Sequence, residues 1–119
     1  MEEWVYRIVG LDDWREALGA GRVPRCGSDE RDGFVHLSTA GTCLETANLY
    51  FDVSEQPVVL EIEAAALGEA LRWEAVESRG GQRFPHLYAA GIPVDSVRSV
   101  TALEHTPAGF VYGERTPRP

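Results

Sequence analysis

The chain has 119 residues, 44% of them hydrophobic and 25% charged, a balance typical of one soluble globular domain. Acidic residues outnumber basic ones by 19 to 11, and the net charge of −8 argues against a nucleic-acid partner, because nucleic-acid-binding domains usually carry a basic face. A small-molecule ligand fits this charge better than a polyanion. Every basic residue is arginine, which excludes Schiff-base catalysis and a phosphate-loop lysine, so any anion would be held by arginine, histidine or backbone amides.

The composition also argues against a membrane protein and a metalloprotein. No stretch approaches the roughly 18 apolar residues of a membrane span, and residues 1–4 are acidic where a secretion signal would be basic. We therefore expect a cytoplasmic protein without membrane contact. Cys26 and Cys43 form no zinc-type spacing with the three histidines, so we expect no metal.

The first part of the chain predicts a strand, a helix and a loop. Residues 3–9 alternate in character, with Tyr6 and Arg7 on opposite faces, which is typical of a strand. Residues 11–18 have an acidic first turn and are followed by glycine, which indicates a short helix. Residues 22–33 are rich in proline, glycine and charge and predict a loop.

The middle of the chain predicts a strand, a helix and a second strand. Residues 34–38 alternate so that Val35 and Leu37 face the core. Residues 42–51 carry an apolar stripe at helical spacing. Residues 58–62 are rich in β-branched side chains and predict another strand.

The remaining elements are a helical turn at 64–71, a strand at 72–76, mostly irregular structure over 77–93 and a strand at 97–103. The tail is expected to fray beyond Gly113. Strands mixed with two or three short helices indicate an α+β fold with small mixed or antiparallel sheets. We expect one compact domain over residues 1–113, followed by the tail at 114–119.

His36 is the first candidate for chemistry. It shares a face of its strand with Ser38, opposite the core positions, so both side chains point toward a cleft or solvent. A histidine in a strand is more often a half-buried residue bonded to a backbone carbonyl, and the residues alone leave both interpretations open.

The run Phe84-Pro85-His86-Leu87-Tyr88 repeats this pattern. In an extended chain His86 and Tyr88 share a face, and Pro85 favours extended geometry at Phe84. A second functional histidine and a histidine used for packing both fit.

An Arg79-Gly80-Gly81 sequence lies just before this run, and Glu74 lies on the preceding strand. Glycine lets backbone amides approach a ligand, and the arginine fork matches phosphate or carboxylate. A plain hairpin turn is the alternative. Glu74, opposite Trp73, faces either a cleft or solvent.

Together these motifs carry a family resemblance. The chain is similar over residues 4–104 to an uncharacterised bacterial family, domain of unknown function 952, through "VYRI", residues 32–39, Thr46-Ala47, Trp73-Glu74, residues 78–81 and residues 84–88. The family name carries no activity.

A second resemblance is to the ADP-ribosyltransferase-like fold. The order "YRI … VHLST … TANLYF … VVLEIEAAAL" resembles its first strand with Arg or His, its second strand with a Ser/Thr motif, its alanine-bearing helix and its third apolar strand. The RNA 2′-phosphotransferase branch has a His-Leu-Ser of its own. The resemblance implies a cleft that takes NAD as a substrate. This acidic chain departs from the basic character of that branch, which puts a transfer-RNA substrate in doubt.

The resemblance also implies roles for the candidate residues. Arg7 would match the first-strand arginine, and Glu74 the catalytic glutamate by its order along the chain. Arg79 and the amides of Gly80 and Gly81 would hold a pyrophosphate, and His36 and Ser38 would orient a ribose. The predicted catalytic residues are His36, Glu74 and His86, and the predicted ligand-binding residues are Arg7, Ser38, Arg79, Gly80, Gly81 and Tyr88.

Three functions remain open at this point. The first is an enzyme that acts on NAD or a related nucleotide. The second is an enzyme that uses His36 and His86 as an acid–base pair on another small metabolite. The third is a non-catalytic binding or sensor module. The oligomeric state is not determined by the sequence.

Overall fold

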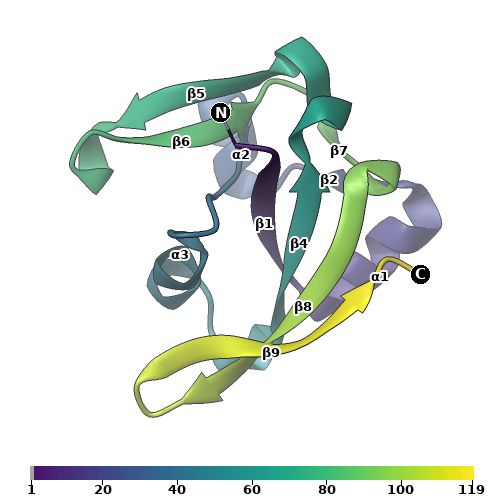
Figure 1. Cartoon of the computed structure of the whole chain (residues 1–119), viewed down its shortest axis with the longest axis vertical. Coiled ribbons are helices and arrows are strands. Elements are labelled where there is room, and N and C mark those ends of the chain that lie inside the picture. The colour runs from purple at the N-terminus through teal and green to yellow at the C-terminus, as the bar shows by residue number, and fades with distance from the viewer. Residues whose placement is uncertain (1) are drawn as a thin grey trace.

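The computed structural model describes residues 2–119 and is organised around a four-stranded antiparallel sheet in the order β1-β4-β8-β9 (Figure 1). Its strands are β1 (Trp4–Gly10), β4 (Pro57–Glu63), β8 (Val97–Thr106) and β9 (Gly109–Pro117). The β8–β9 hairpin extends the sheet on the side away from β1, so β1 lies next to the segments that carry the candidate residues.

Two smaller antiparallel sheets and three α-helices surround this sheet in the described part of the chain. The small sheets pair β2 (Arg22–Pro24) with β7 (Gly91–Pro93), and join β3 (Val35–His36), β6 (Gln82–Leu87) and β5 (Leu71–Val76) in the order β3-β6-β5. The helices are α1 (Leu11–Ala20), α2 (Gly27–Asp32) and α3 (Cys43–Tyr50), and the 3₁₀ turns are η1 (Val53–Glu55), η2 (Ala64–Ala70), η3 (Glu77–Arg79) and η4 (Val94–Ser96). The predicted α+β class is confirmed.

The two faces of the main sheet bury different clusters. One face packs Val5, Val9 and Leu60 against Trp14 of α1 in the larger cluster. The other face packs Ile8 against α3 in a smaller cluster. The alternation of β1 that was predicted from sequence is therefore observed, because successive side chains of a strand point to opposite faces.

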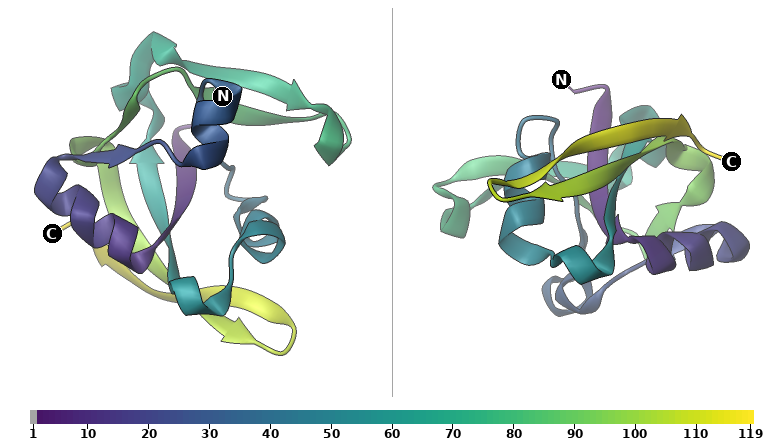
Figure 2. Two further views of the ribbon diagram at one scale, coloured as in Figure 1. Left: turned by 180° about the vertical axis from the view of Figure 1, so that it is seen from behind. Right: turned by 90° about the horizontal axis from the view of Figure 1, so that it is seen from below.

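The β5–β6 hairpin projects from the main sheet, and α1 and α3 lie on opposite faces of the main sheet (Figures 1 and 2). The segment after α2 contacts both the hairpin and the main sheet. Val35 and His36 pair with β6, and Ser38 then forms an isolated antiparallel bridge with Tyr6 of β1. One short segment thus joins the hairpin to the main sheet, so residues on β1, β3 and β6 are brought close together.

Three local predictions are corrected by the structure. Residues 22–33 contain β2 and α2 instead of a loop, and most of residues 82–93 pair as β6 and β7 instead of remaining irregular. The tail does not fray at Gly113, because β9 pairs with β8 as far as Pro117. β2 pairs with the distant strand β7, whereas β6 and β9 each form a hairpin with the strand just before them. In all three cases pairing outweighs the local composition on which the predictions depended.

Gly91 is required where β7 pairs with β2, opposite Pro24. A Cβ added there would lie 2.4 Å from the carbonyl oxygen of Val23, which is backbone and cannot swing away. We expect Gly91→Ala to lower the free energy of unfolding by about 1–3 kcal/mol, measured by urea denaturation. Gly19 in α1 has nothing within 4 Å of an added Cβ, so Gly19→Ala serves as the control and should raise stability by up to about 1 kcal/mol. Equal effects of the two changes would contradict this assignment.

Candidate functional site

A cleft of about 740 Å³ lies beside β1, lined by residues from α2, α3 and the β5–β6 hairpin. This volume is in the range of small-molecule and cofactor sites. Five of the nine predicted site residues line it, namely Arg7, His36, Ser38, Arg79 and His86. Residues from four separate segments of the chain therefore converge on one cavity.

Arg7 lines the cleft from β1 and is fixed by a carboxylate that the sequence did not single out. Its Nη2 donates to Asp29 Oδ2 at 2.7 Å and its Nη1 to Oδ1 at 3.3 Å, while Nη1 also donates to the His36 carbonyl at 2.7 Å. Both side chains are buried. A buried arginine needs such a partner, because an uncompensated charge in the interior costs several kcal/mol. The Arg7 Nε atom is buried and has no hydrogen-bond partner among residues 2–119.

Asp29 is the hub of this cluster. It is fully buried and accepts five hydrogen bonds, two from Arg7, two from the backbone and ring of His36 and one from the Cys26 amide. Burial alone would raise the pKa of Asp29, but the hydrogen bonds from His36 and Arg7 outweigh it and hold the pKa well below its usual range. Asp29 is therefore ionised and accepts from every partner.

His36 is held between two carboxylates. Its Nδ1 lies 2.7 Å from Asp29 Oδ1, and its Nε2 lies 2.8 Å from Asp32 Oδ2. The pKa of Asp32 is lowered to about 2, chiefly by hydrogen bonding from Arg31 and also from His36, so it too is ionised. Because a carboxylate only accepts, both ring nitrogens of His36 must donate, and the arrangement fits a cationic imidazolium.

His86 has a different environment from His36. It is buried on β6, and its Nδ1 lies 2.8 Å from Glu74 Oε1 on the neighbouring strand β5. The same oxygen accepts the Tyr88 hydroxyl at 2.6 Å, and these two bonds, that of Tyr88 first, lower the pKa of Glu74. The ionised Glu74 therefore places the proton of His86 on Nδ1. Within residues 2–119 no group hydrogen-bonds to Nε2, which leaves its lone pair available.

The two histidines are close neighbours. Their ring centroids are 5.9 Å apart, and Phe34 stacks on His86 at 4.0 Å while also touching His36 at 4.7 Å. Phe34 thus fixes the plane of the His86 ring from one side. Ser38 is buried in the same wall, held by a pair of backbone hydrogen bonds to Tyr6 of 2.9 and 2.7 Å.

Arg79 reaches the cleft from the end of β5, but the glycines after it do not. Its Nη2 pairs with Glu45 of α3 at 2.5 Å, and its guanidinium lies 4.6 Å from the centre of the Phe84 ring. Gly80 and Gly81 form the hairpin turn with positive φ values, and their amides donate to carbonyls of that same turn. The pyrophosphate role expected for these two amides is therefore not favoured by the geometry.

Glu74 and Tyr88 likewise do not line the cleft. Both lie behind His86, so Glu74 is placed to orient the imidazole and Tyr88 to support Glu74. The geometry favours a positioning role for Glu74, and the direct role in chemistry suggested by the sequence stays a prediction.

Arginine is well represented in the cleft of this acidic chain. Four of the 11 arginines line it, against three of the 19 acidic residues. Each of these arginines pairs with a carboxylate, so an anionic ligand would replace carboxylates as the partner of the arginines.

Comparison with known proteins places the chain in a family. The model of the family described as "Protein of unknown function (DUF952)" matches residues 8–100. The chain belongs to this family. The crystal structure of protein CC0527 from Caulobacter crescentus is similar to this DUF952 protein with a TM-score of 0.81, at 38% identity over 92% of this chain and 93% of that one.

The solution NMR structure of CC0527 gives the same picture, with a TM-score of 0.76 at 38% identity over 92% of this chain and 91% of the other. Among curated proteins, none matches the chain. Neither the family description nor the names of these structures state an activity, so the function of this DUF952 protein has to be argued from its cleft.

Sequence reasoning missed two residues of the DUF952 cleft region, Asp29 and Asp32. The spacing Cys26-Gly-Ser-Asp29 resembles a helix capping box, in which an acidic N3 side chain accepts the N-cap amide, and Gly33 follows as a left-handed C-cap with φ of 83°. That signal predicts α2. It does not predict that Asp29 turns inward to Arg7, since the partner is 22 residues away.

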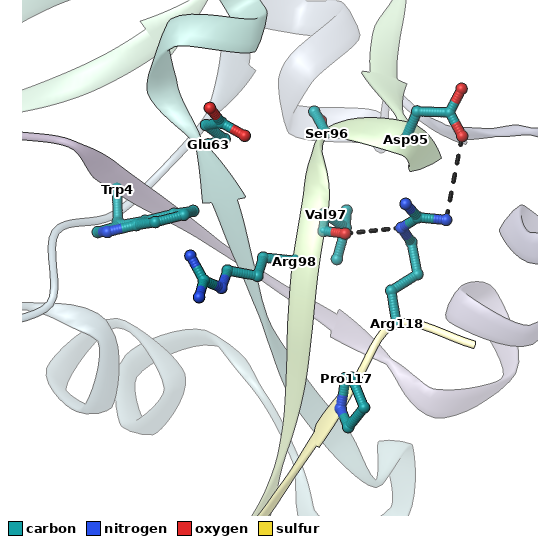
Figure 3. Close-up of a pocket in the computed structure, with 8 residues that line it drawn as sticks. All are labelled: Trp4, Glu63, Asp95, Ser96, Val97, Arg98, Pro117 and Arg118. Atoms are coloured by element: carbon teal, nitrogen blue, oxygen red, sulfur yellow. Dashed lines mark hydrogen bonds and ion pairs between the residues drawn. The ribbon is translucent and has the colours of Figure 1, made fainter.

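A second hollow, of about 350 Å³, lies at the far end of the main sheet and contains none of the predicted site residues (Figure 3). Figure 3 shows the Arg98 guanidinium directed at Trp4, 5.0 Å from the ring centre. Arg118 donates to the Val97 carbonyl at 2.7 Å and so is used to fasten the C-terminal end. The two arginines of this second hollow, Arg98 and Arg118, thus contact neighbouring strands.

No helix among residues 2–119 is long and apolar enough to cross a membrane. The same residues contain no group of three or more His, Cys, Asp or Glu side chains arranged to hold a metal ion.

Proposed function

We propose that this DUF952 protein is a cytoplasmic enzyme whose cleft binds an anionic nucleotide, with NAD as the leading candidate substrate. The observation that carries the proposal is the convergence of Arg7, Ser38 and His86 in one cleft of about 740 Å³. In this cleft the cationic groups attract the ligand, and the free Nε2 of His86 supplies a base next to it.

The arrangement around β1 supports the nucleotide. Arg7 on β1 and Ser38 on the adjoining segment lie across the Tyr6–Ser38 bridge, and the chain continues through α3 to β4, which pairs with β1. This is the order of elements for which the sequence resembles the ADP-ribosyltransferase-like fold, whose members bind NAD in a cleft beside the first two strands.

The chemistry would use His86 as the proton acceptor. In hydrolysis of NAD, the oxygen of water bonds to the ribose C1′ while the bond from C1′ to the nicotinamide nitrogen breaks, and its electron pair neutralises the charge on that nitrogen. The proton lost by water goes to His86 Nε2. Glu74 holds the opposite nitrogen, as carboxylates do in histidine-based active sites. Water is the simplest acceptor, and another hydroxyl would be deprotonated in the same way.

The test is to incubate the full chain with NAD and to measure binding by calorimetry and nicotinamide release by chromatography. We expect both, with release falling by a factor on the order of 100 or more in His86→Ala. His105→Ala is the matched control, because His105 is outside the cleft and packs on Phe110. Absence of binding heat and of nicotinamide would exclude NAD.

A second candidate function is favoured by the paired histidines. Each Nδ1 faces a carboxylate and the rings are 5.9 Å apart, which suits an acid–base pair acting on a different small metabolite. Mass spectrometry of small molecules that co-purify with the protein distinguishes the candidates. If cells that depend on the protein tolerate both His36→Ala and His86→Ala, the remaining alternative is a non-catalytic module.

A further inference from the structure

The carboxylate of Asp32, at the edge of the cleft, is hydrogen-bonded to two side chains. Arg31 donates to it with Nε at 2.8 Å and Nη2 at 3.1 Å, and His36 Nε2 lies 2.8 Å from Oδ2. All three side chains line the cleft. An arginine fork together with an imidazolium is a combination that binds phosphate and carboxylate oxygens strongly.

The two carboxylates around His36 differ in how firmly they are held. Asp29 is fully buried with five hydrogen bonds and cannot leave without exposing Arg7. Asp32 is the last residue of α2, and 31% of its side chain is exposed. A change in its χ1 angle moves the carboxylate into solvent without a change in the backbone.

We infer that Arg31 and His36 form the binding site for a phosphate or pyrophosphate group of the cleft's ligand, and that Asp32 occupies this site in the unliganded protein. The inference deepens the proposed function and rests on it for the identity of the whole ligand. It assigns the pyrophosphate to Arg31 and His36 instead of to the Gly80-Gly81 turn, where the amides donate to carbonyls of the turn.

The chemistry of the exchange is favourable for an anion. Around His36, the guanidinium groups of Arg7 and Arg31 face the carboxylates of Asp29 and Asp32, so the departure of Asp32 leaves the Arg31 guanidinium without a counter-charge. When Asp32 turns out, His36 keeps its Nδ1 bond to Asp29, which holds the ring oriented. The ligand then meets a donor pair that is already in position and needs only to displace one exposed side chain.

Protonation does not open the site in ordinary buffers. The pKa of Asp32 is lowered to about 2, first by the hydrogen bond from Arg31. Asp32 is therefore charged at every pH near neutrality and competes with the ligand as an anion. Removal of its charge by substitution should raise the affinity for phosphate groups.

The experiment compares calorimetric binding of inorganic pyrophosphate to the wild-type chain, Asp32→Asn and Glu30→Gln at low salt. Glu30 lies on the same helix, does not line the cleft, and approaches Arg25 only at 3.9 Å. We expect Asp32→Asn to bind pyrophosphate roughly tenfold more tightly than the wild type, and Glu30→Gln to stay within about twofold. An added Arg31→Gln change should remove the gain.

Nitrogen NMR of the His36 ring gives a second readout, since pyrophosphate should shift the Nε2 signal in Asp32→Asn. An equal gain in affinity in Glu30→Gln would show a general charge effect and overturn the inference. The absence of a gain in Asp32→Asn would also overturn it, and so would binding of malonate in place of pyrophosphate. Pyrophosphate binding without NAD turnover would leave this site standing and reject NAD as substrate. If the protein turns over NAD but Asp32→Asn leaves the affinity for pyrophosphate unchanged, NAD stands as the substrate and the phosphate site at Arg31 and His36 is rejected.

Discussion

Replacement of Asp29 by alanine is expected to lower the free energy of unfolding by about 3–5 kcal/mol, the largest stability effect of any change considered for this protein. The side chain is fully buried and accepts five hydrogen bonds. Its removal leaves the buried Arg7 guanidinium without a counter-charge and leaves the amides of Cys26 and His36 unpaired. Urea denaturation followed by circular dichroism measures the change.

Two further variants show whether the cause is the buried charge. Glu30→Ala, an exposed change on the same helix, should cost less than about 0.5 kcal/mol. The double variant Arg7→Met with Asp29→Ala should cost less than the sum of the two single changes, because the uncompensated cation is then gone. Strict additivity would mean that the pair is not coupled, and the role of Asp29 as the hub would be rejected.

Asp29 also makes stability depend on pH in a defined direction. Folding lowers the pKa of Asp29, so its contribution is complete above the ordinary aspartate pKa of about 4 and is lost as the pH falls below that value toward the folded-state pKa. As the pH falls below about 4, the free energy of unfolding should therefore decrease less steeply in Asp29→Asn than in the wild type.

The largest functional effect is expected at His86. We expect His86→Gln to reduce nicotinamide release by roughly 100- to 10,000-fold, because the group that accepts the proton is gone. Glu74→Gln should reduce release by about 10- to 100-fold, because Glu74 only orients the ring and lies outside the cleft. A larger loss in Glu74→Gln than in His86→Gln would reverse the two roles.

A tautomer measurement tests the positioning role of Glu74 independently of any substrate. Nitrogen NMR should show the neutral His86 ring of the wild type protonated at Nδ1, the atom 2.8 Å from Glu74. In Glu74→Gln this preference should weaken, since an amide can donate as well as accept. His105, which lies outside the cleft, is the internal control and should not change. An unchanged His86 signal would reject the positioning role.

Much of the architecture follows from local pattern. The alternation of β1 predicts that Arg7 shares a face with Val5 and Val9, and these valines are indeed in the core cluster while Arg7 is buried. The same alternation predicts that Val35 and Leu37 are core residues, which the structure confirms. A period of two residues carries this information whatever the strand pairs with.

The errors have a common cause. The tail beyond Gly113 and the run at 82–87 both contain proline, and the tail also contains glutamate, which are poor strand formers in isolation. Both nevertheless pair, with β8 and β5 respectively. Pairing with a strand already held in a sheet overrides local preference, and the identity of that partner is not written in the segment itself.

The sequence by itself determined that this is an acidic, lysine-free α+β chain in which His36 and His86 each lie two residues before a hydroxyl, and its motifs were enough to indicate its family. Only the tertiary structure decided what each histidine does. The two rings differ in their hydrogen bonds. The ring of His36 is hydrogen-bonded to a carboxylate at each nitrogen, whereas the ring of His86 is hydrogen-bonded to Glu74 at Nδ1 alone among the described residues. Protonation depends on which acceptors lie within about 3 Å, and only the fold of α2 and β5 places Asp29, Asp32 and Glu74 against the two rings.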